Sequence, residues 1–153
     1  MPRIGVISDT HGLVRPQALT ALAGAELIVH AGDIGGPEVL DALRAVAPVV
    51  AVRGNNDRGP WAAALPETDV VETGGRSLYV LHDVKALDLD PRAAGFAAVI
   101  AGHSHQPRIE RRDGVLYLNP GSAGPRRFRL PIAVARLDVD ANGIEAEIVA
   151  LDV

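Results

Sequence analysis

Cysteine is missing from this sequence of 153 residues. Its absence excludes a disulfide framework, a thiolate zinc site and a thiol nucleophile. Aromatic residues make up only 3% of the chain, so the predicted core consists of Val, Leu, Ile and Ala. No two glycines lie two positions apart, which excludes the G-x-G-x-x-G nucleotide motif, and no Gly-Lys-[Ser/Thr] P-loop occurs.

The chain also lacks an excess of positive charge and any apolar stretch long enough to span a bilayer. Its 15 basic and 19 acidic residues give a net charge of −4, so no membrane or nucleic-acid partner is expected. Residues 1–3 lead straight into an apolar segment with no signal peptide, which predicts a cytoplasmic protein. The length predicts one domain over residues 1–153, and a homo-oligomer is compatible with the sequence.

Three apolar segments in the first third of the chain each end in polar residues. Residues 4–7 precede Asp9 and His11, residues 27–30 precede Asp33, and residues 49–52 precede Asn55. Helix signals separate them: Pro16 and Pro37 suit first helical turns, and Pro48 ends the second helix. This β-α-β-α-β order predicts parallel strands whose carboxyl ends meet at one edge, where open α/β folds place their sites.

Asp9 and His11 lie one residue apart in a segment expected to be extended, so both side chains should point to the same side and can hold one metal ion. The alternative is that Asp9 caps the next helix and His11 is a solvated loop residue. Asp-x-His alone does not decide between these readings, because the pattern is common.

The remaining chain favours strands over helices. Residues 69–73 and 77–81 form a predicted hairpin, followed by His82, and the buried segment 98–101 precedes His103 and His105. Segments 108–112 with 115–118, and 132–139 with 144–151, predict two further antiparallel pairs, whereas residues 90–95 allow a short helix at most. The expected fold class is α/β, with two packed mixed β-sheets flanked by helices.

Four of the five histidines lie just past an apolar strand, together with two aspartates and an asparagine. Nitrogen and oxygen ligands without sulfur suit two borderline divalent ions, Mn²⁺, Fe²⁺, Ni²⁺ or Zn²⁺, better than a structural zinc. His30 is the exception, because it lies inside an apolar strand and is expected to be a hydrogen-bonded core residue.

These motifs, in this order, resemble those of the calcineurin-like metallophosphoesterases: Asp9-x-His11, Gly32-Asp33, Gly54-Asn55, His82 and Gly102-His103-Ser104-His105. The resemblance covers the whole chain and is closest to the small YfcE-like phosphodiesterase branch, whose further signature is similar to Asn119-Pro120-Gly121-Ser122. It implies an α-β-β-α sandwich and a metal-dependent phosphodiesterase acting on a small phosphate ester.

The resemblance also implies two ligand sets. Asp9, His11, Asp33 and His105 would hold one ion, and Asp33, Asn55, His82 and His103 the second, with Asp33 as the bridge and Mn²⁺ as the expected metal. A hydroxide that bridges the two ions would attack phosphorus, while Asn55 contacts a phosphoryl oxygen. His82 departs from the family pattern, because Asp83 follows it where the family usually has Gly; the alternative is a surface histidine.

The leaving-group side of the site also departs from the family, because Asn56 occupies the position of a histidine that serves as general acid or transition-state clamp. An amide cannot deliver a proton, so we expect a preference for esters with good leaving groups. Asp57 is expected to hold the loop in place. Arg126, Arg127 and Arg129 can bind a substrate phosphate, but the favoured interpretation is that they are solvated surface side chains.

Two other classes of protein compete with this hypothesis. A protein-binding scaffold similar to the retromer subunit VPS29 would share the fold but retain only a vestigial metal site. A metallo-β-lactamase-like hydrolase would carry an H-x-H-x-D-H run, which is absent. The complete ligand set favours the phosphodiesterase.

Overall fold

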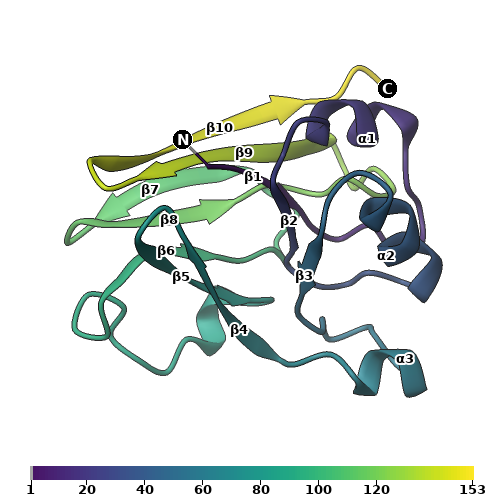
Figure 1. The fold of residues 1–153 in the computed structure, drawn as a ribbon. Coiled ribbons are helices and arrows are strands. Elements are labelled where there is room, and N and C mark those ends of the chain that lie inside the picture. Colours follow the sequence, from purple (N-terminus) through teal and green to yellow (C-terminus); the bar gives the residue numbers. More distant parts are fainter. Residues whose placement is uncertain (1) are drawn as a thin grey trace.

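The computed structural model describes residues 2–153 and contains two five-stranded β-sheets packed face to face (Figure 1). The first sheet has the order β10 (Gly143–Ala150), β9 (Ala133–Asp140), β1 (Arg3–Ile7), β2 (Leu27–His30) and β3 (Val49–Ala51). The second has the order β4 (Thr68–Thr73), β5 (Arg76–Leu81), β6 (Phe96–Ile100), β8 (Val115–Asn119) and β7 (Arg108–Arg112).

The first sheet contains the expected β-α-β-α-β unit. Strands β1, β2 and β3 are parallel, and the crossovers between them carry α1 (Pro16–Leu22) and α2 (Pro37–Arg44). Both helices begin at a proline, a residue that suits the first turn because it needs no backbone N–H there. The C-terminal hairpin of β9 and β10 then extends the sheet on the other side of β1, where β9 pairs antiparallel with it.

The second sheet is also mixed, with parallel pairs β5–β6 and β6–β8 between antiparallel edge pairs. Its two hairpins turn at Gly74-Gly75 and Asp113-Gly114, and all four residues have positive φ. Two consecutive left-handed residues match the right-handed twist of hairpin strands, which explains why glycine occupies three of these positions. The expectation of two packed mixed sheets is confirmed.

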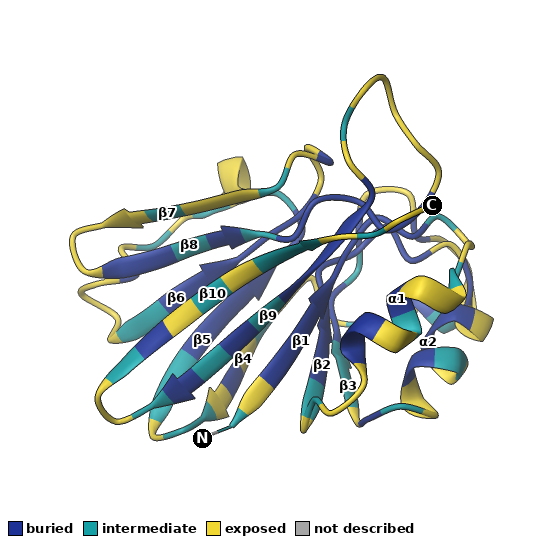
Figure 2. Cartoon of the chain, turned by 90° about the horizontal axis from the view of Figure 1, so that it is seen from above, coloured by how far each residue is buried: buried dark blue, intermediate teal, exposed yellow. Residues whose placement is uncertain are grey.

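Side chains fill the space between the sheets and cover one outer face. Val6 and Val29 from the first sheet belong to the same buried cluster as Leu78 and Ile100 from the second. On the outer face of the first sheet, Ile7 and Ile28 pack with residues of α1 and α2, including Leu22 and Leu43. Figure 2 shows the resulting buried inner strands and the two half-buried helices.

The outer face of the second sheet is covered by a loop rather than by an α-helix. Tyr79 and Val99 pack against Leu87 and Leu89, which follow a single 3₁₀ turn, η1 (Val84–Ala86). Residues 90–95, where a short helix was allowed, form turns, and residues between β3 and β4 include the four-residue helix α3 (Pro60–Ala63). Among residues 2–153 no helix is long and apolar enough to cross a membrane.

Candidate metal centre

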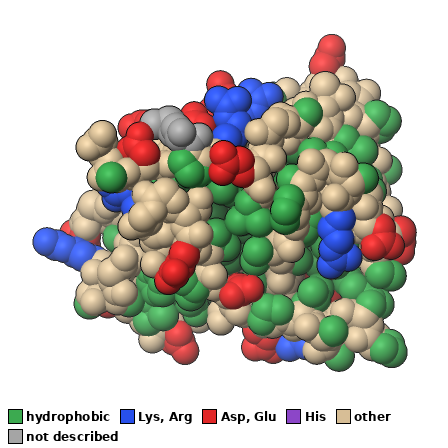
Figure 3. Space-filling model, viewed as in Figure 1, with side chains coloured by type: hydrophobic (Ala, Val, Ile, Leu, Met, Phe, Trp, Pro, Cys, Tyr) green, Lys and Arg blue, Asp and Glu red, His purple; other side chains and the backbone are tan. Residues whose placement is uncertain are grey.

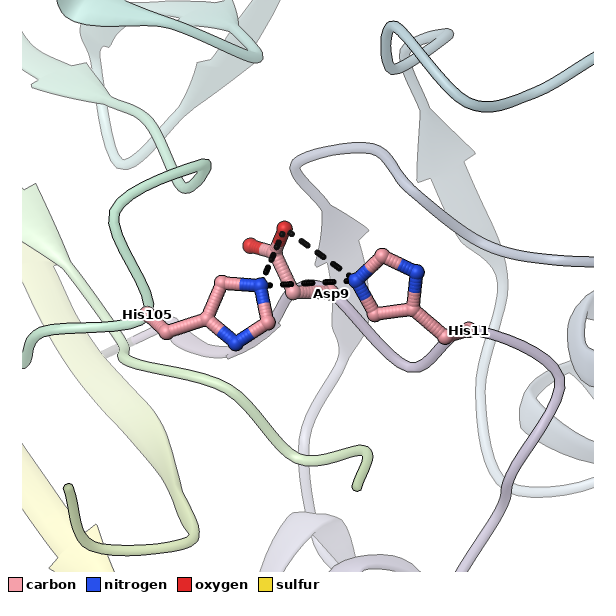
Figure 4. Close-up of side chains that lie close together, drawn as sticks. All are labelled: Asp9, His11 and His105. Carbon is pink, nitrogen blue, oxygen red and sulfur yellow. Dashed lines mark hydrogen bonds and ion pairs between the residues drawn. The ribbon is translucent and has the colours of Figure 1, made fainter. Parts of the chain in front are cut away.

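Asp9, His11 and His105 form the first cluster of potential metal ligands. Asp9 and His11 follow β1, and His105 follows β6. The Asp9 carboxylate lies between the two imidazoles (Figure 4), with Asp9 Oδ1 3.4 Å from Nε2 of His105 and 3.9 Å from Nε2 of His11. The two Nε2 atoms are themselves 3.4 Å apart. Three donor atoms therefore converge on one point from two sheets.

Asp33, His82 and His103 form the second cluster, at the ends of β2, β5 and β6. Nε2 of His82 is 3.3 Å from Oδ2 of Asp33 and 3.3 Å from Nδ1 of His103. The first cluster adjoins it, because Oδ2 of Asp33 is also 3.9 Å from Nε2 of His11. Asp33 thus lies between the clusters, at the place expected of a bridging ligand.

The structure brings six of the seven predicted ligands together in these two clusters. The seventh, Asn55, belongs to neither cluster. Asn55 is exposed and lines a hollow of about 430 Å³ together with Arg53 and Arg58, and none of the other six predicted ligands lines that hollow. His82, the doubtful member by sequence, is buried rather than on the surface.

The backbone at the site is unusual. Seven non-glycine residues among residues 2–153 have positive φ, and five of them are the predicted ligands Asp9, His11, Asp33, His103 and His105. The expectation of an extended segment at Asp9 and His11 is therefore wrong, because φ is 55° and 47° there. Left-handed non-glycine residues carry strain, and such strain gathers at functional sites.

Two glycines allow the backbone to approach the carboxylates closely. A Cβ on Gly54 would lie 2.2 Å from Oδ1 of Asp33, and one on Gly102 would lie 2.6 Å from Oδ2 of Asp9 and 2.0 Å from Oγ of Ser8. Any larger residue at either position would displace a predicted ligand.

The donor atoms fit divalent cations. Asp9 Oδ1 is buried and has no hydrogen-bond partner among residues 2–153, which is costly for a carboxylate oxygen unless a cation satisfies it. Nδ1 of His82 donates to the carbonyl of Ala31 at 2.7 Å, which leaves Nε2 as the ring nitrogen that faces Asp33 and His103. Metal-ligating histidines usually make such a bond to a backbone carbonyl.

The pKa values of the second cluster reflect a coupled pair. Burial raises the pKa of Asp33, but the hydrogen bonds from His82 and Asn56, with the charges of His82 and His11, hold it well below its usual range. Burial lowers the pKa of His82, yet the hydrogen bonds to Asp33 and Ala31 raise it above its ordinary value. A divalent cation can replace the proton between these two side chains.

Comparison with known proteins identifies the family. Residues 2–142 match the calcineurin-like phosphoesterase superfamily domain. The chain belongs to this superfamily. A probable metallophosphoesterase of Methanothermobacter thermautotrophicus is 35% identical over 158 residues, which cover 95% of this chain and 91% of the relative.

Solved structures share the fold of this calcineurin-like chain. An archaeal phosphodiesterase superposes with a TM-score of 0.80 at 22% identity, over 96% of this chain and 99% of that one. Vps29 of Chaetomium thermophilum gives a TM-score of 0.78 at 20% identity, over 99% and 98% of the two chains. YfcE of Escherichia coli gives 0.71 at 24% identity, over 98% and 100%. The predicted superfamily and its small YfcE-like branch are confirmed.

Side chains next to the predicted metal ligands hold these ligands in place. Both amide groups of Asn56 donate to Asp33, from the backbone N at 3.0 Å and from Nδ2 at 3.1 Å. Asp57 accepts hydrogen bonds from the backbone N–H groups of Ile34, Gly35 and Gly54, so it holds the loop, as expected.

Sequence reasoning missed three supporting side chains. Ser8 donates to Oδ2 of Asp9 at 2.7 Å, and Asn119 donates to the carbonyl of Gly102 at 2.9 Å. Asp83 lies 3.7 Å from Nε2 of His103, so the residue that departs from the family pattern faces a predicted ligand. Asn119 opens the recognised Asn-Pro-Gly-Ser signature, whereas nothing in the sequence indicated the contacts of Ser8 and Asp83.

His30 is a buried hydrogen-bonded histidine, as the sequence predicts. Its Nδ1 accepts from the N–H of Gly32 at 3.0 Å, so Nε2 carries the proton and donates to Oγ1 of Thr10 at 3.0 Å. Burial, with the charge of His82, lowers the pKa of His30 to about 3. The neutral ring thereby supports the loops that carry Asp9 and Asp33.

This pKa shift predicts acid sensitivity of the fold. Because the folded pKa is about 3 and the ordinary value 6.5, the contribution of His30 to stability is complete above pH 6.5 and falls as pH drops toward 3. We expect His30→Gln to be less stable than the native chain at pH 8. Between pH 6 and 4, however, the difference in unfolding free energy should narrow by about 1.4 kcal/mol per pH unit. Urea unfolding of both proteins in the presence of a chelator measures this difference. A difference in unfolding free energy that stays the same from pH 8 to pH 4 would contradict the prediction.

Proposed function

We propose that this protein is a metal-dependent phosphodiesterase whose two divalent ions lie on either side of Asp33. The observation that carries the proposal is the meeting of two ligand clusters at one point, with a buried carboxylate oxygen of Asp9 left without a partner. Asp9, His11 and His105 would hold one ion, His82, His103 and Asn55 the other, and Asp33 both. Mn²⁺ is the proposed metal, with Zn²⁺, Fe²⁺ and Ni²⁺ as alternatives.

When bound, such ions supply a nucleophilic hydroxide at neutral pH and stabilise charge that grows on the phosphoryl oxygens. The chain's own residues position this chemistry. Asp33 is fixed by both N–H donors of Asn56, and Asp9 by Ser8 and the backbone N–H of His103. Asn55, exposed at the rim beside them, is free to donate from its amide to a phosphoryl oxygen of the substrate.

Diesters with acidic leaving groups are the proposed substrates. The side chain of Asn56 faces the clusters, because its Nδ2 donates to Asp33. As an amide it has no proton acidic enough to protonate a leaving group. The hollow that Asn55 lines carries charged side chains, Arg53, Arg58 and Glu67, beside apolar Ala62 and Ala63, which suits an ester substituent in contact with water.

Metal-stripped protein tests the proposal directly. Mn²⁺ should restore hydrolysis of bis-p-nitrophenyl phosphate, and the rate should exceed that on the monoester p-nitrophenyl phosphate. Failure of every divalent metal to restore activity would remove the enzyme proposal. A faster monoester reaction would remove the diester assignment alone.

Asn56→His tests the leaving-group argument. A histidine at this position can donate a proton, and general acid catalysis contributes about 10²–10⁴-fold. We expect turnover of alkyl esters to rise at least about tenfold relative to p-nitrophenyl esters, despite loss of the bond from Asn56 to Asp33. Asn56→Gln, which keeps an amide, is the matched control. If the ratio of alkyl-ester to p-nitrophenyl-ester turnover is the same in Asn56→His and Asn56→Gln, the missing acid does not limit the rate.

A protein-binding scaffold is the second candidate, and the fold it shares with Vps29 is the observation that favours it. Exposed large apolar side chains lie on separate elements rather than in one segment, for example Val70 on β4, Ile109 on β7 and Phe128 in a loop. Charged and apolar side chains are interspersed on the face shown in Figure 3. Catalysis by the metal-loaded protein distinguishes the two functions.

A further inference from the structure

Residues 125–131, here called the arginine arm, form a loop whose root is fixed against the metal centre. Ser122 and Ile132 pair across its base, and Oγ of Ser122 donates to the carbonyl of Asp9 at 3.0 Å. A Cβ on Gly124 would lie 2.5 Å from the carbonyl oxygens of Asp9 and Thr10, so the backbones touch there. Arg15 donates to the carbonyl of Gly124 at 3.3 Å.

The tip of the arginine arm is an exposed aromatic residue. Phe128 is 88% exposed, far more than any other large apolar side chain that the structure describes. Its φ of 53° is one of only two positive values outside the predicted ligands and the glycines of residues 2–153. A left-handed bulky residue is a conformational outlier, and one that exposes its ring to water gains no burial to offset the strain. Figure 2 shows this exposed loop projecting from the sandwich.

Arg126 and Arg127 of the arm differ in their hydrogen-bond partners. Arg126 turns back on its own loop and on the chain end, donating to the carbonyls of Leu130 and Val153 at 3.4 Å. Arg127 is exposed and makes no side-chain hydrogen bond or ion pair within residues 2–153. It follows Gly124, whose backbone touches that of Asp9 and Thr10, by three residues, so its guanidinium is available to an anion bound beside the predicted ligands.

The length and the charge of the arginine arm suit a nucleoside joined to a phosphate. Phe128 follows Gly124 by four residues, so its Cα lies within about 14 Å of the contact with Asp9, the scale of a nucleoside joined to a phosphate. Three arginines in residues 126–129 give the arm a local positive charge, although the chain carries a net charge of −4. The arm thus presents a cation near the site of phosphate binding and an aromatic face farther out.

Building on the proposed function, we propose that the arginine arm is a substrate-binding element for nucleoside phosphodiesters. Arg127 binds a non-bridging phosphate oxygen, and Phe128 stacks on the base of the substituent that is not expelled. A protein partner is disfavoured, because a single aromatic ring offers about 200 Å², whereas a stable interface buries about 800 Å² per partner.

Two esters with the same leaving group test this: thymidine 5′-p-nitrophenyl phosphate and methyl p-nitrophenyl phosphate. Base stacking predicts that Phe128→Ala lowers the ratio of the two kcat/KM values, thymidine over methyl, by about tenfold. The loss should appear in KM, and thymidine 5′-monophosphate should bind about tenfold more weakly in calorimetry. Phe128→Trp should preserve the ratio. Arg127→Ala should raise KM for both esters by about tenfold.

Arg126→Ala is the matched control, because it removes an arginine of the same loop whose guanidinium contacts the carbonyls of Leu130 and Val153 instead; the ratio should stay within about twofold. If Phe128→Ala keeps the native ratio of kcat/KM for the thymidine ester over the methyl ester, the arm does not bind the base and this proposal fails. Mn²⁺-dependent cleavage of the methyl ester would still support the proposed phosphodiesterase function. Hydrolysis of neither ester by the native chain would overturn both proposals.

Discussion

Asp33→Asn is expected to abolish phosphodiester hydrolysis, with a loss of about 10³-fold or more. The carboxylate is 3% exposed and lies within 4 Å of imidazole nitrogens from both clusters, Nε2 of His11 and Nε2 of His82. An amide has the same shape but no charge, and loss of several kcal/mol of charge stabilisation corresponds to this drop in rate. Initial rates on bis-p-nitrophenyl phosphate in saturating Mn²⁺ measure it.

Asp41→Asn is the matched control, because Asp41 is exposed on α2 and pairs only with Arg44. It should keep full activity. Asp33→Asn should also bind fewer Mn²⁺ ions per chain in equilibrium dialysis, while circular dichroism shows a native fold. Native turnover in folded Asp33→Asn would remove Asp33 as the bridging ligand.

Gly102→Ala is expected to reduce both activity and stability, because its Cβ would overlap Oγ of Ser8 and approach Oδ2 of Asp9. Overpacking of this kind costs about 1–3 kcal/mol of folding stability. Because the carboxylate must move, we expect hydrolysis to fall by about 10²-fold, as when one catalytic interaction is lost. Urea unfolding and Mn²⁺-dependent rates measure the two effects.

Gly143→Ala controls for the general cost of replacing a glycine. A Cβ there meets nothing within 4 Å and its φ is not positive, so stability should change by less than about 0.5 kcal/mol. Equal effects of the two substitutions would show that Gly102 does not position Asp9.

Sequence reasoning succeeded where short-range pattern and topology coincide. The strands before Asp9, Asp33 and Asn55 form a parallel unit, so their carboxyl ends share an edge whatever the loops do. His82 and the His103/His105 pair reach this edge because the second sheet packs on the first with its own parallel strands, β5 and β6, facing the same way.

Features that depend on tertiary contacts were out of reach. The left-handed backbone at Asp9 and His11 is held by hydrogen bonds to the loop after β2, from the Asp9 N–H to the Gly32 carbonyl at 3.0 Å and from the His11 N–H to the Asp33 carbonyl at 2.9 Å. Residues 82–95 partly bury Leu87 and Leu89 without helical periodicity, because these side chains pack on the outer face of the second sheet.

Anomalous diffraction from crystals soaked in Mn²⁺ would locate the proposed ions. We expect two peaks per chain, one among Asp9, His11 and His105 and one among His82, His103 and Asn55, with Asp33 in contact with both. A single peak, or two peaks that Asp33 does not join, would contradict this expectation.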